Sequence, residues 1–536
     1  MSDPGSFDVV VVGTGFTGIY ALHRCRQAGW SVLGIEAGDG VGGTWYWNRY
    51  PGARCDVESV DYSYSFDGAL QASWRWSENY ATQPEIRSYL EHATDRFGLR
   101  DLIVFGERVV AAHHDDDRWI LTTDAGRKVS ARFVIMATGS LSAPQVPDLP
   151  GLADFAGEVV LTAMWPERQV SFAGRRVGVI GTGASALQLV PIVAADAAEL
   201  TVFQRTANYS IPVRVAPYSE QDQQQIQDDY PQRRAKSWRA AAGTPHESYP
   251  VSAHGLSVAE QREVLDASWQ KGGVLFAKTF PDQNTDISVN DLARAYVEEK
   301  IRSIVKDASI AADLVPVDHP IGAKRICSDL GYYEVFNHDH VRLINLRREP
   351  IKEVNARAIV TADREIELDL LIFATGFDAM TGPLTRIELT GPRGDTITNL
   401  WRHGPLTYLG VAVPGMPNLF VLNGAGTPSV LANMALSAEQ QVNWTIDLIA
   451  YCVAHGIDEV EPRADAARKW TDHVTLVGEK TFMAKVNSWY VGANIEGKPR
   501  AFLPYAGGFA TYTQTCEAVA KRGYDGFVLT RRSGTA

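Results

Sequence analysis

Two glycine-rich turns, each directly after a short apolar run, constrain the fold of this chain more than any other feature. The first, Gly13-Thr14-Gly15-Phe16-Thr17-Gly18, follows the apolar residues 9–12. The second, Gly181-Thr182-Gly183-Ala184-Ser185-Ala186, follows residues 176–180. A continuous apolar run suits a strand buried on both faces of a parallel sheet. Because a helical pattern follows each turn, both segments predict the strand–turn–helix start of a dinucleotide-binding unit.

The residues that end the next strand of each unit give the two predicted sites opposite charge preferences. Glu36 ends the strand predicted at residues 31–35, and its carboxylate can accept hydrogen bonds from a ribose diol but would repel a 2′-phosphate. Arg205 follows the strand predicted at residues 200–203 and can pair with a 2′-phosphate. The simplest interpretation is one FAD and one NADPH in one chain. The alternatives are a glycine turn without a ligand and an arginine that only meets solvent.

Composition excludes several classes of protein. The chain has 536 residues and a net charge of −12, which argues against a nucleic-acid partner. No apolar run of membrane-spanning length and no secretory signal is seen, so we expect a cytoplasmic protein without membrane association. The five cysteines are scattered and form no C-x-x-C, which argues against a disulfide framework, a thiol redox pair and a cysteine zinc site. We expect no metal, and a monomer or weak homo-oligomer.

The sequence after the two glycine turns predicts the domain organisation. Residues 216–319 are polar and have a helical pattern, with a capping box at Ser257 and Glu260. The next segment with the pattern of a strand is residues 370–373. The predicted fold class is α/β, with two Rossmann-like dinucleotide-binding domains (FAD and NADP) and a helical insertion. The expected boundaries are 1–145 with 380–536 for the FAD domain, 150–215 with 320–379 for the NADP domain, and 216–319 for the insertion.

Several motifs resemble one enzyme family. Residues 43–56, GTWYWNRYPGARCD, resemble the signature of type I Baeyer–Villiger monooxygenases. Ala374-Thr375-Gly376-Phe377-Asp378, Lys324-Arg325 and residues 488–495 also match, and the resemblance extends over nearly the whole chain. It implies bound FAD, NADPH as a cosubstrate, and insertion of one oxygen atom from O₂ beside a ketone carbonyl through a C4a-peroxyflavin, to give an ester or lactone.

The resemblance also implies roles for individual residues. Arg325 is implied as the active-site arginine held by Asp56, since a guanidinium stays charged and offers donors in a fixed fork; the alternative is a structural ion pair. The substrate pocket is implied at Ser429, Val430, Leu431 and Met434. The cofactor residues are Gly13, Gly15, Phe16, Gly18, Glu36, Gly43, Thr44, Trp45 and Asp56 for FAD, and Gly181, Thr182, Gly183, Ser185, Arg205, Thr206, Lys324 and Trp489 for NADPH. Tyr62 and Arg325 are also expected to bind a cofactor.

One family position departs from its pattern. The family carries F-x-G-x-x-x-H-x-x-x-W-P or W-D between its domains; Phe155, Gly157, Trp165 and Pro166 match, but Leu161 stands at the histidine position. That histidine is implied to relay movements between domains, so we expect Leu161 to affect coupling and rate rather than the type of reaction. The alternatives to a ketone monooxygenase are an N- or S-oxygenating flavin monooxygenase, a flavin-dependent NADPH reductase, and a nonenzymatic flavoprotein or cofactor-sensing module.

Overall fold

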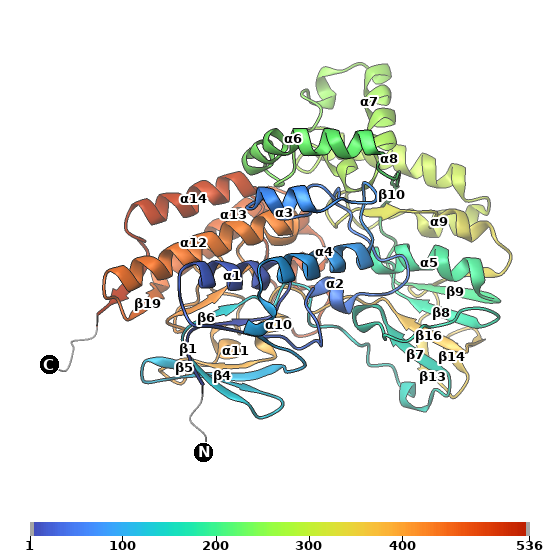
Figure 1. Cartoon of the computed structure of the whole chain (residues 1–536). Coiled ribbons are helices and arrows are strands. Elements are labelled where there is room, and N and C mark those ends of the chain that lie inside the picture. The colour runs from blue at the N-terminus through green and yellow to red at the C-terminus, as the bar shows by residue number, and fades with distance from the viewer. Residues whose placement is uncertain (1–4, 532–536) are drawn as a thin grey trace.

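The two glycine turns lie at the carboxyl ends of parallel strands in two separate sheets (Figure 1). The computed structural model describes residues 5–531. In the first sheet β1 is parallel to β2 and β6, and two late strands, β17 and β18, add to segments from the first quarter of the chain. Its strands are β1 (Gly5–Val12), β2 (Val32–Ile35), β3 (Ile103–Val104), β4 (Val109–Asp115), β5 (Arg118–Thr123), β6 (Lys128–Met136), β17 (Glu388–Thr390) and β18 (Leu419–Val421).

The second sheet is parallel throughout, in the order β12-β9-β8-β16-β7. Its central strand β8 is nearly all apolar, as expected of a strand covered on both faces. These strands are β7 (Glu158–Leu161), β8 (Arg176–Ile180), β9 (Glu199–Gln204), β12 (Val341–Asn345) and β16 (Leu370–Phe373). Small sheets pair β10 (Ser210–Pro212) with β11 (Cys327–Asp329), β13 (Ile351–Val354) with β14 (Ala358–Thr361) and β15 (Glu365–Glu367), and β19 (Glu459–Pro462) with β20 (Phe527–Thr530).

Helices pack on both sheets and form the predicted insertion. Figure 1 shows α6, α7 and α8, in green, at the top of the molecule, above both sheets. The capping box at the start of α7 is confirmed, with Ser257 and Glu260 bonded reciprocally. The two parallel-stranded sheets with helices packed on them confirm the predicted α/β fold class. The helices are α1 (Phe16–Gln27), α2 (Thr44–Trp47), α3 (Gly68–Ser73), α4 (Gln83–Arg96), α5 (Ala184–Asp196), α6 (Glu220–Arg239), α7 (Val258–Lys271), α8 (Ile287–Ile304), α9 (Ala308–Leu314), α10 (Gly382–Thr385), α11 (Ile397–Leu400), α12 (Met434–Ala454), α13 (Ala464–Glu479) and α14 (Phe509–Lys521).

The first glycine of each turn lies very close to a loop that follows a neighbouring strand. Gly13 has φ +94°, and a Cβ there would lie 2.7 Å from the carbonyl oxygen of Ala137. Gly181 has φ +121°, and a Cβ there would lie 2.3 Å from the carbonyl oxygen of Ala374. Both positions require glycine for the backbone conformation and for the close approach. The A-T-G segments after β6 and β16 are thus packed against the two turns.

Helix α12 packs against α1 and carries a carboxyl group into the protein core. Glu439 is 1% exposed and accepts hydrogen bonds from the backbone N–H and the hydroxyl of Ser65. Burial raises the pKa of Glu439 to about 7, an effect that the Ser65 bonds and the charge of Arg234 only partly oppose. The folded protein therefore holds a proton on this group that the unfolded chain releases at lower pH.

We expect this carboxyl to make the protein less stable as the pH rises from about 4.5 to about 7. Because the folded pKa is the higher one, the native state binds more protons in that window, and about 3 kcal/mol of stability is lost across it. Urea unfolding of the parent and of Glu439→Gln, measured at several pH values, checks this slope. The difference in unfolding free energy between the two should change with pH below 7 and level off above it; a pH-independent difference would contradict the assignment.

Candidate active site

The first glycine turn has the geometry of a phosphate-binding site. A Cβ at Gly18 would lie 1.8 Å from the carbonyl oxygen of Gly13, so glycine is needed there for the helix to pack on the strand. Gly15 differs, because its φ is −78° and a Cβ would meet only ordinary contacts, the nearest at 3.5 Å. The protein's own packing does not require glycine at position 15. Within the described chain no side chain caps the N-terminus of α1, so its N–H groups remain available to an anion.

The second turn repeats this arrangement. Gly183 has φ −89°, and a Cβ there would meet no atom within 4 Å. It is the N-cap of α5, which also lacks a side-chain cap in the structure described. The turn is held by the hydroxyl of Thr182, which donates to the carbonyl oxygen of Thr206 at 2.6 Å, while Ser185 is half-buried in the first turn of α5. Both turns therefore combine open space with uncapped helical N–H groups, which fits a dinucleotide phosphate.

Glu36 is buried at the end of β2 and faces the first turn. Its Oε2 accepts from the backbone N–H and hydroxyl of Thr14, at 2.7 and 2.9 Å, and Oε1 accepts from the N–H of Gly38 at 2.9 Å. A carboxylate offers about four acceptor positions, so one remains at Oε1. The side chain thus shapes the turn and keeps capacity for a ribose hydroxyl.

A cluster of cations lies at the corresponding edge of the second sheet. Arg205 is exposed just after β9, and Thr206 follows it. Arg347, which follows the neighbouring strand β12, donates to the hydroxyl of Thr206 at 3.2 Å and to Asp318 at 2.5 Å. Burial lowers the pKa of Lys324, and the charges of Arg347 and Arg205 lower it further. Sequence reasoning missed Arg347, because only the β9–β12 pairing brings it beside Thr206.

An arginine–aspartate pair joins segments that are far apart in the chain. Arg325 Nε and Nη2 donate to the two carboxylate oxygens of Asp56, each at 2.7 Å, and Nη1 donates to the carbonyl oxygen of Val430 at 2.8 Å. Burial alone would lower the pKa of Arg325, but the Asp56 carboxylate raises it above its usual value. The guanidinium is therefore permanently charged and fixed in orientation.

The other residues expected near the flavin gather around α2. Gly43 is the N-cap of α2 and has φ +54°, and Thr44 is exposed at the start of that helix. The indole N–H of Trp45 donates to the hydroxyl of Tyr62 at 3.2 Å, and Tyr62 stacks edge-to-face on Phe16, with 5.0 Å between ring centroids. The structure thus brings these five residues together beside the first turn.

The expected substrate segment lies next to the arginine. Ser429 is fully buried with φ +41°, and its hydroxyl donates to the carbonyl oxygen of Asn423 at 3.0 Å. Val430 is buried, whereas Leu431 and Met434, at the start of α12, are half-buried.

Trp489 packs beside Tyr490. Sequence reasoning missed Tyr490 as a site residue. Burial raises the pKa of Tyr490 to about 12, although the nearby charge of Arg325 opposes this shift.

The segment with the unusual leucine lies between the second sheet and helix α2. Leu161 ends β7, pairs in register with Phe373, and packs in the apolar cluster around Phe155. A few residues on, the backbone N–H of Trp165 donates to the carbonyl oxygen of Trp47 at 3.3 Å. A leucine suits this apolar position, and the segment itself connects the second sheet with α2.

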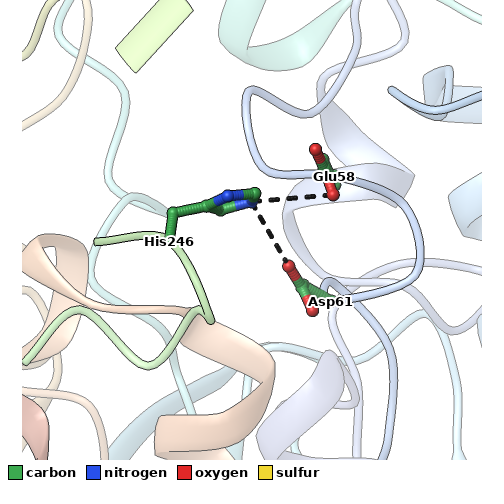
Figure 2. A group of neighbouring side chains, drawn as sticks. All are labelled: Glu58, Asp61 and His246. Carbon is green, nitrogen blue, oxygen red and sulfur yellow. Dashed lines mark ion pairs between the residues drawn. The ribbon is translucent and has the colours of Figure 1, made fainter. Parts of the chain in front are cut away.

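A carboxylate–histidine group outside this region could be mistaken for a metal site. Figure 2 shows His246 facing Glu58 and Asp61, with Nε2 at 3.6 and 3.9 Å from their carboxylate oxygens. Arg233 of α6 already pairs with both carboxylates, and its Nε and Nη2 each donate to Asp61 at 2.7 Å. The guanidinium offsets one of the two negative charges, and together these side chains form an ion-pair network that fastens the insertion to residues 58–61.

Comparison with known proteins agrees with this geometry. A family model described as pyridine nucleotide-disulphide oxidoreductase matches residues 10–254. A solved structure of an oxidized steroid monooxygenase bound to NADP is 49% identical, with a TM-score of 0.94, and covers 98% of this chain and all of that one. A structure titled OTEMO complex with FAD and NADP is 38% identical with the same TM-score and covers 98% of this chain and all of that one. A Baeyer–Villiger monooxygenase of Pseudooceanicola batsensis is 38% identical over 533 residues, 98% of this chain and 96% of the relative.

These findings first define a class, the flavoprotein monooxygenases with two dinucleotide sites. The sequence contains no C-x-x-C, and its five cysteines are buried and free. Within that class, the chain belongs to the Baeyer–Villiger monooxygenase family. Among residues 5–531, no helix has the length and apolar character that crossing a bilayer requires.

Proposed function

We propose that this enzyme uses FAD and NADPH to insert one oxygen atom of O₂ next to a ketone carbonyl, giving an ester or lactone. The observation that carries the proposal is the two-point Arg325–Asp56 pair beside the substrate segment. The space above Gly15 and Gly183 and the uncapped N-termini of α1 and α5 fit the two cofactors. FAD, when bound, would supply the redox chemistry that links NADPH oxidation to the activation of O₂.

The chain's own contribution is a fixed positive charge in a partly enclosed site. Addition to a ketone develops negative charge on oxygen, and preorganised donors stabilise such charge more than water does. Arg325 provides these donors without losing its proton, and Asp56 and the Val430 carbonyl hold its plane. Burial raises the pKa of the nearby Cys327 thiol to about 12, which keeps it in the poorly nucleophilic thiol form.

The domain assignment follows the two sheets. We assign residues 1–145 and 380–536 to FAD, 150–215 and 320–379 to NADP, and 216–319 to the insertion; the strands β17 and β18 in the first sheet and β12 and β16 in the second support these boundaries. Five buried, unpaired cysteines support a reducing, cytoplasmic location. We propose a monomer or weak homo-oligomer.

Purified protein tests the proposal directly. We expect yellow protein whose NADPH oxidation is stimulated by cyclic ketones, with lactone identified by mass spectrometry. NADPH oxidation that yields only hydrogen peroxide would indicate a reductase, and oxygenation of amines or sulfides without any lactone would indicate the N- or S-oxygenating class. Protein that binds no flavin would favour a nonenzymatic binding module.

Arg347 and Arg205 are proposed to select NADPH over NADH. We expect Arg347→Ala to weaken the binding of 2′,5′-ADP about 10-fold and to leave 5′-AMP unchanged, because a charge-assisted bond to the 2′-phosphate is lost. Arg205→Glu should reverse the preference between NADPH and NADH. Calorimetric titration with both nucleotides measures the first effect, and steady-state kinetics the second. Arg342→Ala, which removes an exposed charge on β12, is the control; an unchanged 2′,5′-ADP affinity in Arg347→Ala would remove Arg347 from the site.

A further inference from the structure

A cavity of about 580 Å³ lies in the insertion, which is the size range of small-molecule sites. The end of α6, the loop 240–248 and residues 277–284 form its walls. Much of the lining is apolar, including Ala241, Ala277 and Phe280. The ion-pair network of Figure 2 fastens this loop, since His246 lines the cavity and faces Glu58 and Asp61.

Three cations line the same cavity. They are Lys236 and Arg239 at the end of α6, and Lys278, which ends the short 3-10 helix that follows α7. Within residues 5–531 none of the three has an acidic partner in a salt bridge, although the chain as a whole carries a net charge of −12. Glu247 is the one carboxylate in the lining, so the lining is net positive. Unpaired cations around an apolar cavity favour an anion with an apolar body.

The cavity adjoins the candidate active site. The carbonyl oxygen of Ala242, in its wall, accepts from the backbone N–H of Asn433 at 2.9 Å. Asn433 is the N-cap of α12 and follows the substrate segment whose Val430 carbonyl binds Arg325. Burial and, to a smaller extent, the positive charge of Arg325 together lower the pKa of Lys278 to about 8, so the two cations lie within electrostatic reach of each other. An anion beside Lys278 would favour its charged form.

We propose that this cavity binds the acidic group of the substrate, so that the preferred ketones carry a carboxylate on an apolar body. This inference rests on the proposed function. The ketone carbonyl then lies toward Arg325 and the carboxylate toward Lys278, Lys236 and Arg239. The apolar walls accommodate the carbon skeleton between these two ends.

A matched pair of substrates tests the inference. We compare 3-(2-oxocyclohexyl)propanoate with its primary amide, which has nearly the same shape but no charge. The parent enzyme should have a kcat/KM at least about 10-fold higher for the acid, carried mostly by KM. Lys278→Met should reduce the acid-to-amide ratio about 10-fold, and raising the NaCl concentration should reduce it as well. Lys128→Met, at an exposed position at the start of β6, should leave the ratio unchanged.

A second measurement does not depend on turnover. Calorimetric titration of the flavin-loaded protein with 3-cyclohexylpropanoate, which lacks a ketone, should show binding that Lys278→Met weakens. Equal kcat/KM values for acid and amide, or an acid preference that Lys278→Met leaves intact, would overturn the inference. If neither the test pair nor cyclohexanone yields lactone, the proposed function fails, and the titration still decides whether the cavity binds carboxylates.

Discussion

Arg325→Ala is expected to retain its yellow flavin and to form lactone roughly 10²–10³-fold more slowly than the parent, the effect of losing a preorganised donor to a developing oxyanion. The guanidinium makes three hydrogen bonds, two to Asp56 and one to the Val430 carbonyl. These bonds fix the orientation of its positive charge. Gas chromatography of the lactone, alongside NADPH consumption, measures the loss. Because NADPH is still oxidised in part, hydrogen peroxide should account for most of the electrons consumed.

Two further variants make this result specific. Arg325→Lys keeps a positive charge but cannot make the paired bonds to Asp56, so we expect only partial recovery. Arg262→Ala removes an exposed arginine paired with Glu299 and should behave as the parent. The flavin spectrum and the thermal unfolding midpoint establish that Arg325→Ala is folded. Lactone formation at the parent rate in folded Arg325→Ala would exclude this arginine from the reaction.

Gly15→Ala is expected to fold normally and to be isolated almost colourless. The added methyl meets ordinary contacts in the protein, the nearest at 3.5 Å, but occupies the space that the FAD pyrophosphate needs above α1. Displacing that group removes about two charge-assisted hydrogen bonds, which corresponds to a roughly 10²–10³-fold weaker affinity. Flavin content per protein and the Kd for added FAD measure the effect.

Gly183→Ala provides the mirror-image result. Its methyl meets no protein atom within 4 Å, so we expect stable yellow protein in which NADPH no longer reduces the flavin at ordinary concentrations. Gly68→Ala, which also adds a methyl to open space but lies in α3, is the control for both. Full flavin content in Gly15→Ala, or unchanged NADPH affinity in Gly183→Ala, would show that the corresponding turn holds no phosphate.

Features carried by local patterns could be predicted from the sequence. The predicted strand at residues 370–373 coincides with β16, and the capping box at Ser257 begins α7. The fold class and the family were likewise predicted and are confirmed. The helix predicted to follow the first turn begins already at Phe16, because the last residues of the glycine turn are themselves helical. The individual site residues and the domain boundaries stay predictions.

Contacts that depend on strand order could not be predicted. Arg347 follows a strand with no motif and reaches Thr206 only because β12 lies beside β9 in the sheet. Lys278 lies in a polar insertion, where a lysine gives no signal until the fold places it near Arg325. The Val430 carbonyl is a backbone group, and side-chain motifs do not record it.

The pairing of Arg325 with Asp56 has a mechanical consequence. Arg325 lies just before β11, which packs against α5, whereas Asp56 lies in the loop that follows α2, and only 2.7 Å separates their paired atoms. Because hydrogen bonds do not survive a separation of a few ångströms, any movement of the two segments apart would release the guanidinium from its fixed orientation. The role proposed for Arg325 therefore depends on these two distant segments of the chain staying in contact.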